Sequence, residues 1–151
     1  MTSHPILAQW IHSGQENHLF PAATHRLNRP AAQLPRFVRR SALAVRTYRL
    51  LCPIDWAALP ERDLFRRYGQ PTLPYASYAA AYLFKINQRL PHMSNLHRCL
   101  VEQPALCWLF GFPIPARFRP PNSAHADACL PTQRHLARML RQIPNAYLQA
   151  L

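Results

Sequence analysis

The segment from Thr132 to Ile143 places basic side chains at the spacing of a helix that binds a charged surface. Its apolar residues follow the i, i+3, i+4, i+7 pattern of an inward-facing stripe, at Leu136, Met139, Leu140 and Ile143. Its arginines lie about 180° away around the helix axis, at Arg134, Arg138 and Arg141. Because guanidinium groups pair well with phosphate oxygens, such a helix can dock on a core and face a nucleic acid.

The first turn of this segment is the part that would read DNA bases. In helix-turn-helix proteins the early residues of the second helix reach base edges in the major groove, and here these are Gln133, Arg134 and His135. Thr132 precedes them as the expected N-cap. An ordinary solvated helix face has the same pattern, so the helix alone does not decide between the two interpretations.

A second group of arginines falls in a helix predicted from Pro35 to Leu51, which Pro53 ends. A narrow apolar stripe runs along this helix through Phe37, Ala44, Tyr48 and Leu51. The basic residues are spread around the rest of it, at Arg36, Arg39, Arg40, Arg46 and Arg49. They cover too wide an arc to define one groove-facing edge, and a solvated helix face explains them equally well. If several of these arginines contact DNA, the slope of log affinity against log salt concentration should steepen by roughly one unit per phosphate neutralised.

The charge balance favours a polyanionic partner. The chain has 18 Lys+Arg against 6 Asp+Glu, a formal net charge of +12. Lys85 is its only lysine. A GC-rich genome would explain the preference for arginine equally well, but it does not explain the shortage of acidic residues.

No set of residues has the spacing of a catalytic centre. Two-metal nucleotidyl transfer requires carboxylates clustered around cations about 4 Å apart, whereas the acidic residues here are scattered as Glu16, Asp55, Glu61, Asp63, Glu102 and Asp127. Asp55 fits better as a helix cap, and Glu102 as a solvent-facing helix residue. A Gly-rich phosphate loop, a GxSxG motif and a Cys/His nucleophile pair are also absent from the sequence. We therefore assign no catalytic residue and no cofactor to this chain.

The histidines and cysteines do not have metal-site spacing. His97 and Cys99 are two residues apart on a predicted helix, so they point in different directions. No zinc spacing is matched by His125, Cys129 and His135. The four cysteines are expected to be reduced thiols, at Cys52, Cys99, Cys107 and Cys129.

Without a signal-peptide pattern or an apolar run of roughly 18 residues, we expect a cytoplasmic protein that does not enter a membrane.

The elements that would position these side chains are helices. Val, Ile and Thr are too few for a sheet, and 16 prolines divide the chain into short segments. We predict an all-α, irregular multi-helix bundle with a helix-turn-helix-like C-terminal part. Residues 1–34 have no sustained period and are expected to form a loosely ordered arm, and residues 35–151 a helical DNA-binding domain.

Local signals set the expected boundaries within this domain. Asp55 caps one helical turn over 55–60, and a short helix follows at 61–68. The helix over 75–90 is apolar nearly all round and hence central, with a main face of Tyr75, Tyr78, Ala79, Tyr82, Leu83, Ile86 and Leu90. Ser94 caps a helix to about residue 103, Pro104 begins another that Gly111 ends, and 112–131 is an irregular linker. After the 132–143 helix, a last segment runs from Pro144 to the end of the chain.

Four stretches occur in a fixed order over about half of the sequence: Tyr82–Leu90, Met93–Leu100, Pro104–Pro113 and Leu130–Leu140. In this order they resemble the amino-terminal helical domain of bacterial insertion-sequence transposases. The resemblance implies binding of duplex DNA at the ends of the element and self-association into a homo-oligomer. It implies a downstream RNase-H-like core that holds an acidic triad and Mg²⁺, before which we expect this chain to stop. It also implies that Thr132, Arg134 and Arg138 lie in the helix closest to DNA, although the linker before that helix is longer than the family pattern.

Three classes of function follow from these patterns. The first is a DNA-binding transposase domain. The second is a helical interaction module, in which the aromatic helix over 75–90 and Trp108 face a partner chain and the charge only maintains solubility. A basic membrane-surface protein ranks last, because the arginines are distributed over several helices and not over one amphipathic segment.

Overall fold

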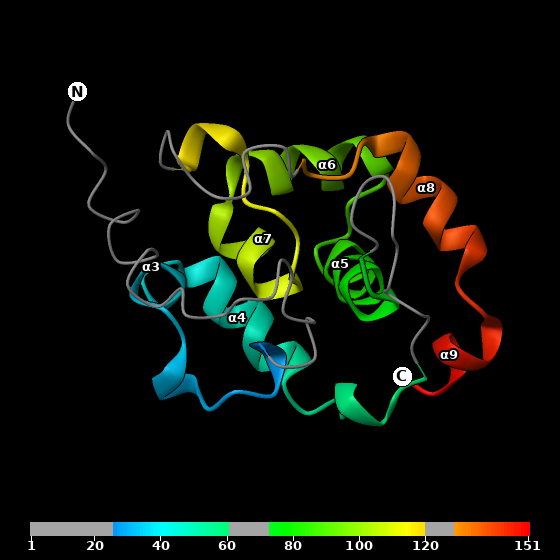
Figure 1. Ribbon diagram of the computed structural model, residues 1–151, viewed down its shortest axis with the longest axis horizontal. Helices are drawn as coiled ribbons and strands as arrows, with labels where there is room; N and C mark the ends of the chain where they lie inside the picture. Colours follow the sequence, from blue (N-terminus) through cyan, green and yellow to red (C-terminus); the bar gives the residue numbers. More distant parts are fainter. Residues whose placement is uncertain (1–25, 61–72, 120–128) are drawn as a thin grey trace, which may run out of the picture.

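The computed structural model describes residues 26–60, 73–119 and 129–151. These residues form the α-helices α3 to α9 and three short 3₁₀ turns, η1 (Ala31–Gln33), η2 (Trp56–Ala58) and η3 (Ala116–Phe118), without a strand. The predicted all-α bundle is confirmed. Figure 1 shows α7 in the interior of the arrangement, with α3 and α4 toward one end of the long axis and α8 and α9 toward the other.

The helix predicted from residue 35 to 51 is divided into α3 (Arg36–Arg39) and α4 (Ala42–Leu51). Ser41 separates them, because its extended backbone stops the first helix and its Oγ accepts a hydrogen bond from the amide of Ala44 at 3.2 Å. The prediction of one helix is wrong for this reason. The four residues of the predicted apolar stripe are nevertheless buried, Phe37 in α3 and the other three in α4.

The packed structure begins before the predicted domain boundary at residue 35. Leu27 and Leu34 are buried in the core, and the Tyr48 hydroxyl donates a hydrogen bond to the carbonyl of Arg29. The first 25 residues of the predicted arm lie outside the described residues. After α4, Asp55 occupies the N-cap position of η2, but its side chain makes no capping hydrogen bond, so the predicted aspartate cap is wrong. The predicted helix at 61–68 lies outside the described residues.

Helix α5 (Tyr75–Asn87) is the buried helix that the sequence predicts. Eight of its thirteen residues are buried, on nearly all sides of the helix. Ile86 was predicted on the apolar face but is 70% exposed, because burial ends with Phe84 and the last turn projects beyond the core. The helix stops at Asn87, and Arg89 adopts a left-handed conformation with φ of 53°.

Helices α6 (Met93–Glu102) and α7 (Pro104–Phe110) follow in close succession. The N-cap of α6 is His92 and not Ser94, because the Asn95 side chain accepts a hydrogen bond from the His92 amide at 3.2 Å. In α7, Pro104 occupies the first turn and Gly111 ends the helix with φ of 79°, as predicted.

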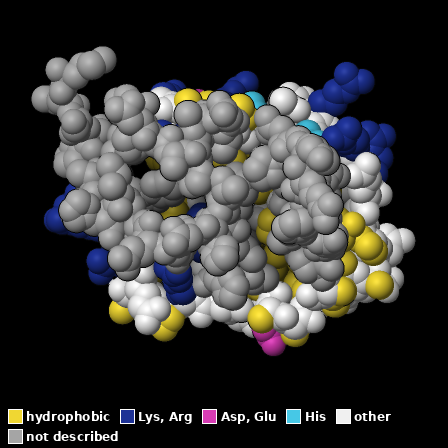
Figure 2. All heavy atoms as spheres, in the orientation of Figure 1, with side chains coloured by type: hydrophobic (Ala, Val, Ile, Leu, Met, Phe, Trp, Pro, Cys, Tyr) yellow, Lys and Arg dark blue, Asp and Glu magenta, His cyan; other side chains and the backbone are white. Residues whose placement is uncertain are grey.

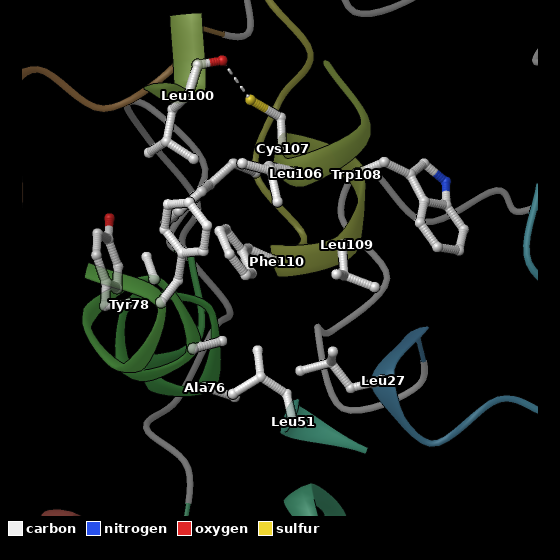
Figure 3. Packing of buried hydrophobic residues seen from close by; sticks show 14 of the residues in the cluster. Leu27, Leu51, Ala76, Tyr78, Leu100, Leu106, Cys107, Trp108, Leu109 and Phe110 are labelled. Atoms are coloured by element: carbon white, nitrogen blue, oxygen red, sulfur yellow. Dashed lines mark hydrogen bonds between the residues drawn. The ribbon is translucent and has the colours of Figure 1, made fainter. Parts of the chain in front are cut away.

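Helix α7 forms the centre of the core. All its residues from Ala105 to Phe110 are buried, and it packs against α3, α4, α5 and α6. Figure 3 shows Leu109 and Phe110 pointing toward side chains from three other segments: Leu27, Leu51 and Ala76. Ring contacts extend this core, because Phe110 lies 5.7 Å from Phe84 between centroids. Such aromatic pairs each contribute about 0.5–1.5 kcal/mol beyond the area they bury.

The chain ends with α8 (Gln133–Gln142) and α9 (Asn145–Gln149). Thr132 caps α8 as predicted, since its Oγ1 accepts a hydrogen bond from the amide of His135 at 3.2 Å. Three of the four predicted core residues of this segment are buried, but Leu140 is 42% exposed. In α9, Tyr147 is buried and its ring lies 5.8 Å from that of Tyr75.

Candidate nucleic-acid interface

Helix α8 is held on the bundle by its apolar side and presents its basic side outward. Leu136, Met139 and Ile143 are at most 3% exposed, and the helix packs against α5 and α6. The side chains on the opposite side are exposed: Thr132, Gln133, Arg134, Arg138 and Arg141. The amphipathic orientation predicted for this segment is therefore present in the structure.

The outward side of α8 borders a concave site, which we call the α8 hollow. Its volume is about 510 Å³, and the described residues that line it are Thr132, Arg134, His135, Arg138 and Arg141. These are five of the six residues predicted for DNA contact in this helix, and Gln133 is the exception. Three guanidinium groups face one space together with the N-terminal turn of a helix, and both features attract anions. An anionic group such as a phosphate is the ligand that this chemistry favours.

His135, for which a base contact was predicted, makes two contacts inside the protein. It is half-buried, and its Nε2 lies 3.0 Å from the hydroxyl of Tyr78 on α5. Its Nδ1 lies 2.6 Å from an Nη of Arg138, one turn further along α8. Both ring nitrogens are therefore engaged inside the protein, so His135 connects the core to the hollow.

Tyr78 and Tyr82 on α5 contact α8 through their hydroxyls, although the sequence analysis placed them only on an apolar face. The Tyr82 hydroxyl donates a hydrogen bond to the backbone carbonyl of Leu136 in α8. Burial, followed by the proximity of Tyr78, raises the pKa of Tyr82, which keeps this hydroxyl protonated and able to donate. Together the two tyrosines, one turn apart, attach α8 to α5 through their polar tips. The sequence contains one signal for these contacts: both buried positions are tyrosine and not phenylalanine, and a buried tyrosine hydroxyl usually has a hydrogen-bond partner.

The second predicted group of arginines forms a separate surface, the α3–α4 surface, made of Arg36, Arg39, Arg40, Arg46 and Arg49. All five are exposed, and both helices pack against α7. Figure 1 places α3 and α4 near the opposite end of the long axis from α8. Figure 2 shows Lys and Arg side chains in both regions, at the left and at the upper right of the view. The fold does not bring the two groups of arginines into one site.

Some arginines outside these two surfaces have structural roles. Arg26 is only 7% exposed, donates a hydrogen bond to the carbonyl of Trp108 at 2.6 Å and stacks 4.7 Å from the centre of its ring. Arg117 donates to the carbonyl of Val101 at 2.7 Å and lies over the ring of Phe118. Trp108, which the interaction-module hypothesis places on a partner-binding face, is only 5% exposed.

The cysteines differ in their surroundings. Cys107 is buried and its Sγ donates to the carbonyl of Leu100 at 2.9 Å (Figure 3). Burial raises the pKa of Cys107 and, to a lesser extent, that of Cys99, so both thiols are held protonated. Cys129 is exposed. Within the described part of the chain, no three His, Cys, Asp or Glu side chains come together as a metal site.

Comparisons with known proteins identify no family for this chain. Searches against protein-family models, curated proteins and solved structures find no match for the chain. Among residues 26–60, 73–119 and 129–151, no helix has both the length and the apolar character needed to cross a membrane.

Proposed function

We propose that this domain binds duplex DNA through the α8 hollow and performs no catalysis of its own. The observation that carries the proposal is that Arg134, Arg138 and Arg141 line one concave site along the outward side of a capped helix. In this proposal the domain acts as the DNA-binding part of an insertion-sequence transposase, recognises duplex DNA at the ends of the element and forms a homo-oligomer there. The catalytic core and its Mg²⁺ would belong to another part of the enzyme, and the complex would form in the cytoplasm.

The charges on α8 suit the sugar-phosphate backbone. Each phosphate that a guanidinium neutralises releases condensed counterions, so three contacts would contribute about 2.7 units to the log–log salt slope. The amides of the first helical turn favour the same anionic partner. Gln133, also exposed in this turn, is proposed to reach a base edge.

The α3–α4 surface is proposed to contact a separate stretch of phosphate backbone. Its five arginines are exposed, and it lies toward the opposite end of the long axis (Figure 1). Because the two surfaces share no residue, their contributions to affinity should add independently.

The proposal is tested by measuring the affinity for a fluorescent 20-base-pair duplex over a range of salt concentrations. We compare wild type with R134Q/R138Q and with the matched control R89Q/R98Q, which removes the same charge from exposed positions outside both surfaces. R134Q/R138Q should lower the salt slope by about two units, and the control should leave it close to wild type. Equal losses in the two variants would show that net charge alone drives binding. Absence of binding by wild type at low salt would refute the proposed function.

A further inference from the structure

A continuous set of contacts runs from the buried helix α5 to the α8 hollow. Tyr78 is 1% exposed, and its ring packs against that of His135 at 5.8 Å between centroids. Its hydroxyl lies 3.0 Å from Nε2 of His135, and Nδ1 of the same ring lies 2.6 Å from Nη2 of Arg138. Arg138 is exposed and lines the hollow. A core residue thereby reaches a surface guanidinium through one imidazole.

The chemistry of these groups determines where the imidazole proton lies. A guanidinium can only donate hydrogen bonds and stays charged, so the group facing Arg138 must be an acceptor. Nδ1 of His135 is therefore unprotonated. In a neutral ring the proton is then on Nε2, which donates to the Tyr78 hydroxyl. An imidazolium would place an Nδ1–H group against the positive guanidinium and remove the contact.

We propose that His135 is a positioning residue, which holds the Arg138 guanidinium at the α8 hollow so that it meets one backbone phosphate of bound DNA. This inference rests on the proposed function, and it replaces the base-reading role expected for His135. An arginine held before its ligand arrives loses less conformational freedom on binding than a freely rotating one. The guanidinium has five N–H donors, so those not used by Nδ1 are available to phosphate oxygens.

The proton arrangement is tested first in the free protein. Long-range ¹⁵N–¹H spectra of wild type at neutral pH should show His135 as the neutral tautomer with its proton on Nε2. The R138Q variant tests the second contact, since loss of the guanidinium should shift the Nδ1 resonance of His135. Detection of an Nδ1–H tautomer or of an imidazolium in wild type, or an Nδ1 resonance unchanged in R138Q, would overturn the proposal.

Two substitutions at His135 separate its two hydrogen bonds. Asn places an oxygen near the position of Nδ1, so H135N keeps an acceptor for Arg138, whereas Gln places its amide near Nε2, so H135Q keeps the group facing Tyr78. H135Q should weaken binding of the 20-base-pair duplex by roughly 2- to 10-fold, which is less than the loss in R138Q, and should leave the salt slope close to wild type because Arg138 keeps its charge. H135N should retain most of the affinity. In the H135Q background, R138Q should cause a smaller loss than it does in wild type, whereas R134Q should cause its full loss.

The outcomes distinguish this inference from the proposed function. Wild-type affinity in H135Q, or independent effects of H135Q and R138Q, would overturn the positioning role while leaving DNA binding intact. Absence of duplex binding by wild type would overturn the proposed function, and with it the phosphate partner of Arg138. Melting curves of each variant establish that it is folded. If H135Q does not fold, H135A provides the second test, because it removes the acceptor for Arg138 and should weaken duplex binding in the same direction, and wild-type affinity in H135A would overturn the proposal.

Discussion

Replacement of Arg26 by alanine should destabilise the fold, although this residue falls in the segment that the sequence assigned to a loose arm. Its side chain is 7% exposed, donates a 2.6 Å hydrogen bond to the carbonyl of Trp108 and lies 4.7 Å from the centre of that indole ring. A hydrogen bond from a charged group contributes about 1.5–3 kcal/mol, and a largely desolvated cation–π contact about 1–2 kcal/mol. The cost of burying the charge offsets part of this sum. We expect a net loss of about 2–3 kcal/mol in the free energy of unfolding.

Urea unfolding followed by circular dichroism measures this loss. The control is R36A, which removes the same charge from an exposed position on α3 and should change the free energy of unfolding by less than about 0.5 kcal/mol. R26M keeps an unbranched side chain over the indole ring and should lose less stability than R26A. Equal midpoints for R26A and R36A would refute the role of Arg26 in the packed core.

Three further predictions concern thiols, backbone conformation and a buried phenol. Alkylation of the native protein should modify Cys129, which is exposed, and leave Cys107 unmodified, because Cys107 is buried and burial raises the pKa of its thiol. Equal rates of alkylation at the two cysteines, followed by mass spectrometry, would contradict this prediction. Gly111→Ala should lower the free energy of unfolding by about 1–2 kcal/mol, because Gly111 has a φ of 79°. Arg89→Gly should raise it by a smaller amount, because Arg89 has a φ of 53°, which glycine adopts without steric strain. Urea midpoints that move in the same direction in the two variants would argue against these assignments. The pKa of Tyr82 is raised in the folded state, so its contribution to stability is full below the unfolded value of about 10 and is lost as the pH rises above it. Y82F should therefore show a shallower loss of stability than wild type above that pH in thermal melts.

The elements that could be predicted are those whose signals are local. Thr132 caps α8, and Pro104 and Gly111 bound α7, because capping and left-handed conformations depend on residues within one turn of the helix end. The burial of α5 also follows from its own composition, which is apolar on nearly every side.

Other boundaries had more than one local solution. Ser41 could continue or cap a helix, and it caps α4. Ser94 was a good N-cap by type, but Asn95 bonds back to the amide of His92, so the helix begins earlier. Neither choice can be made from propensity, since the competing caps differ by only about 1 kcal/mol and packing decides between them.

By itself, the sequence determined the helical class, the two groups of arginines and the amphipathic division of α8, because each depends on composition or on a period of 3.6 residues. Only the tertiary structure decided that these groups lie toward opposite ends of the molecule, that Arg26 belongs to the core, and that Tyr78 meets His135 across 57 residues of chain. Contacts of this kind depend on which helix faces pack together, and a helical period specifies a face without specifying its neighbour.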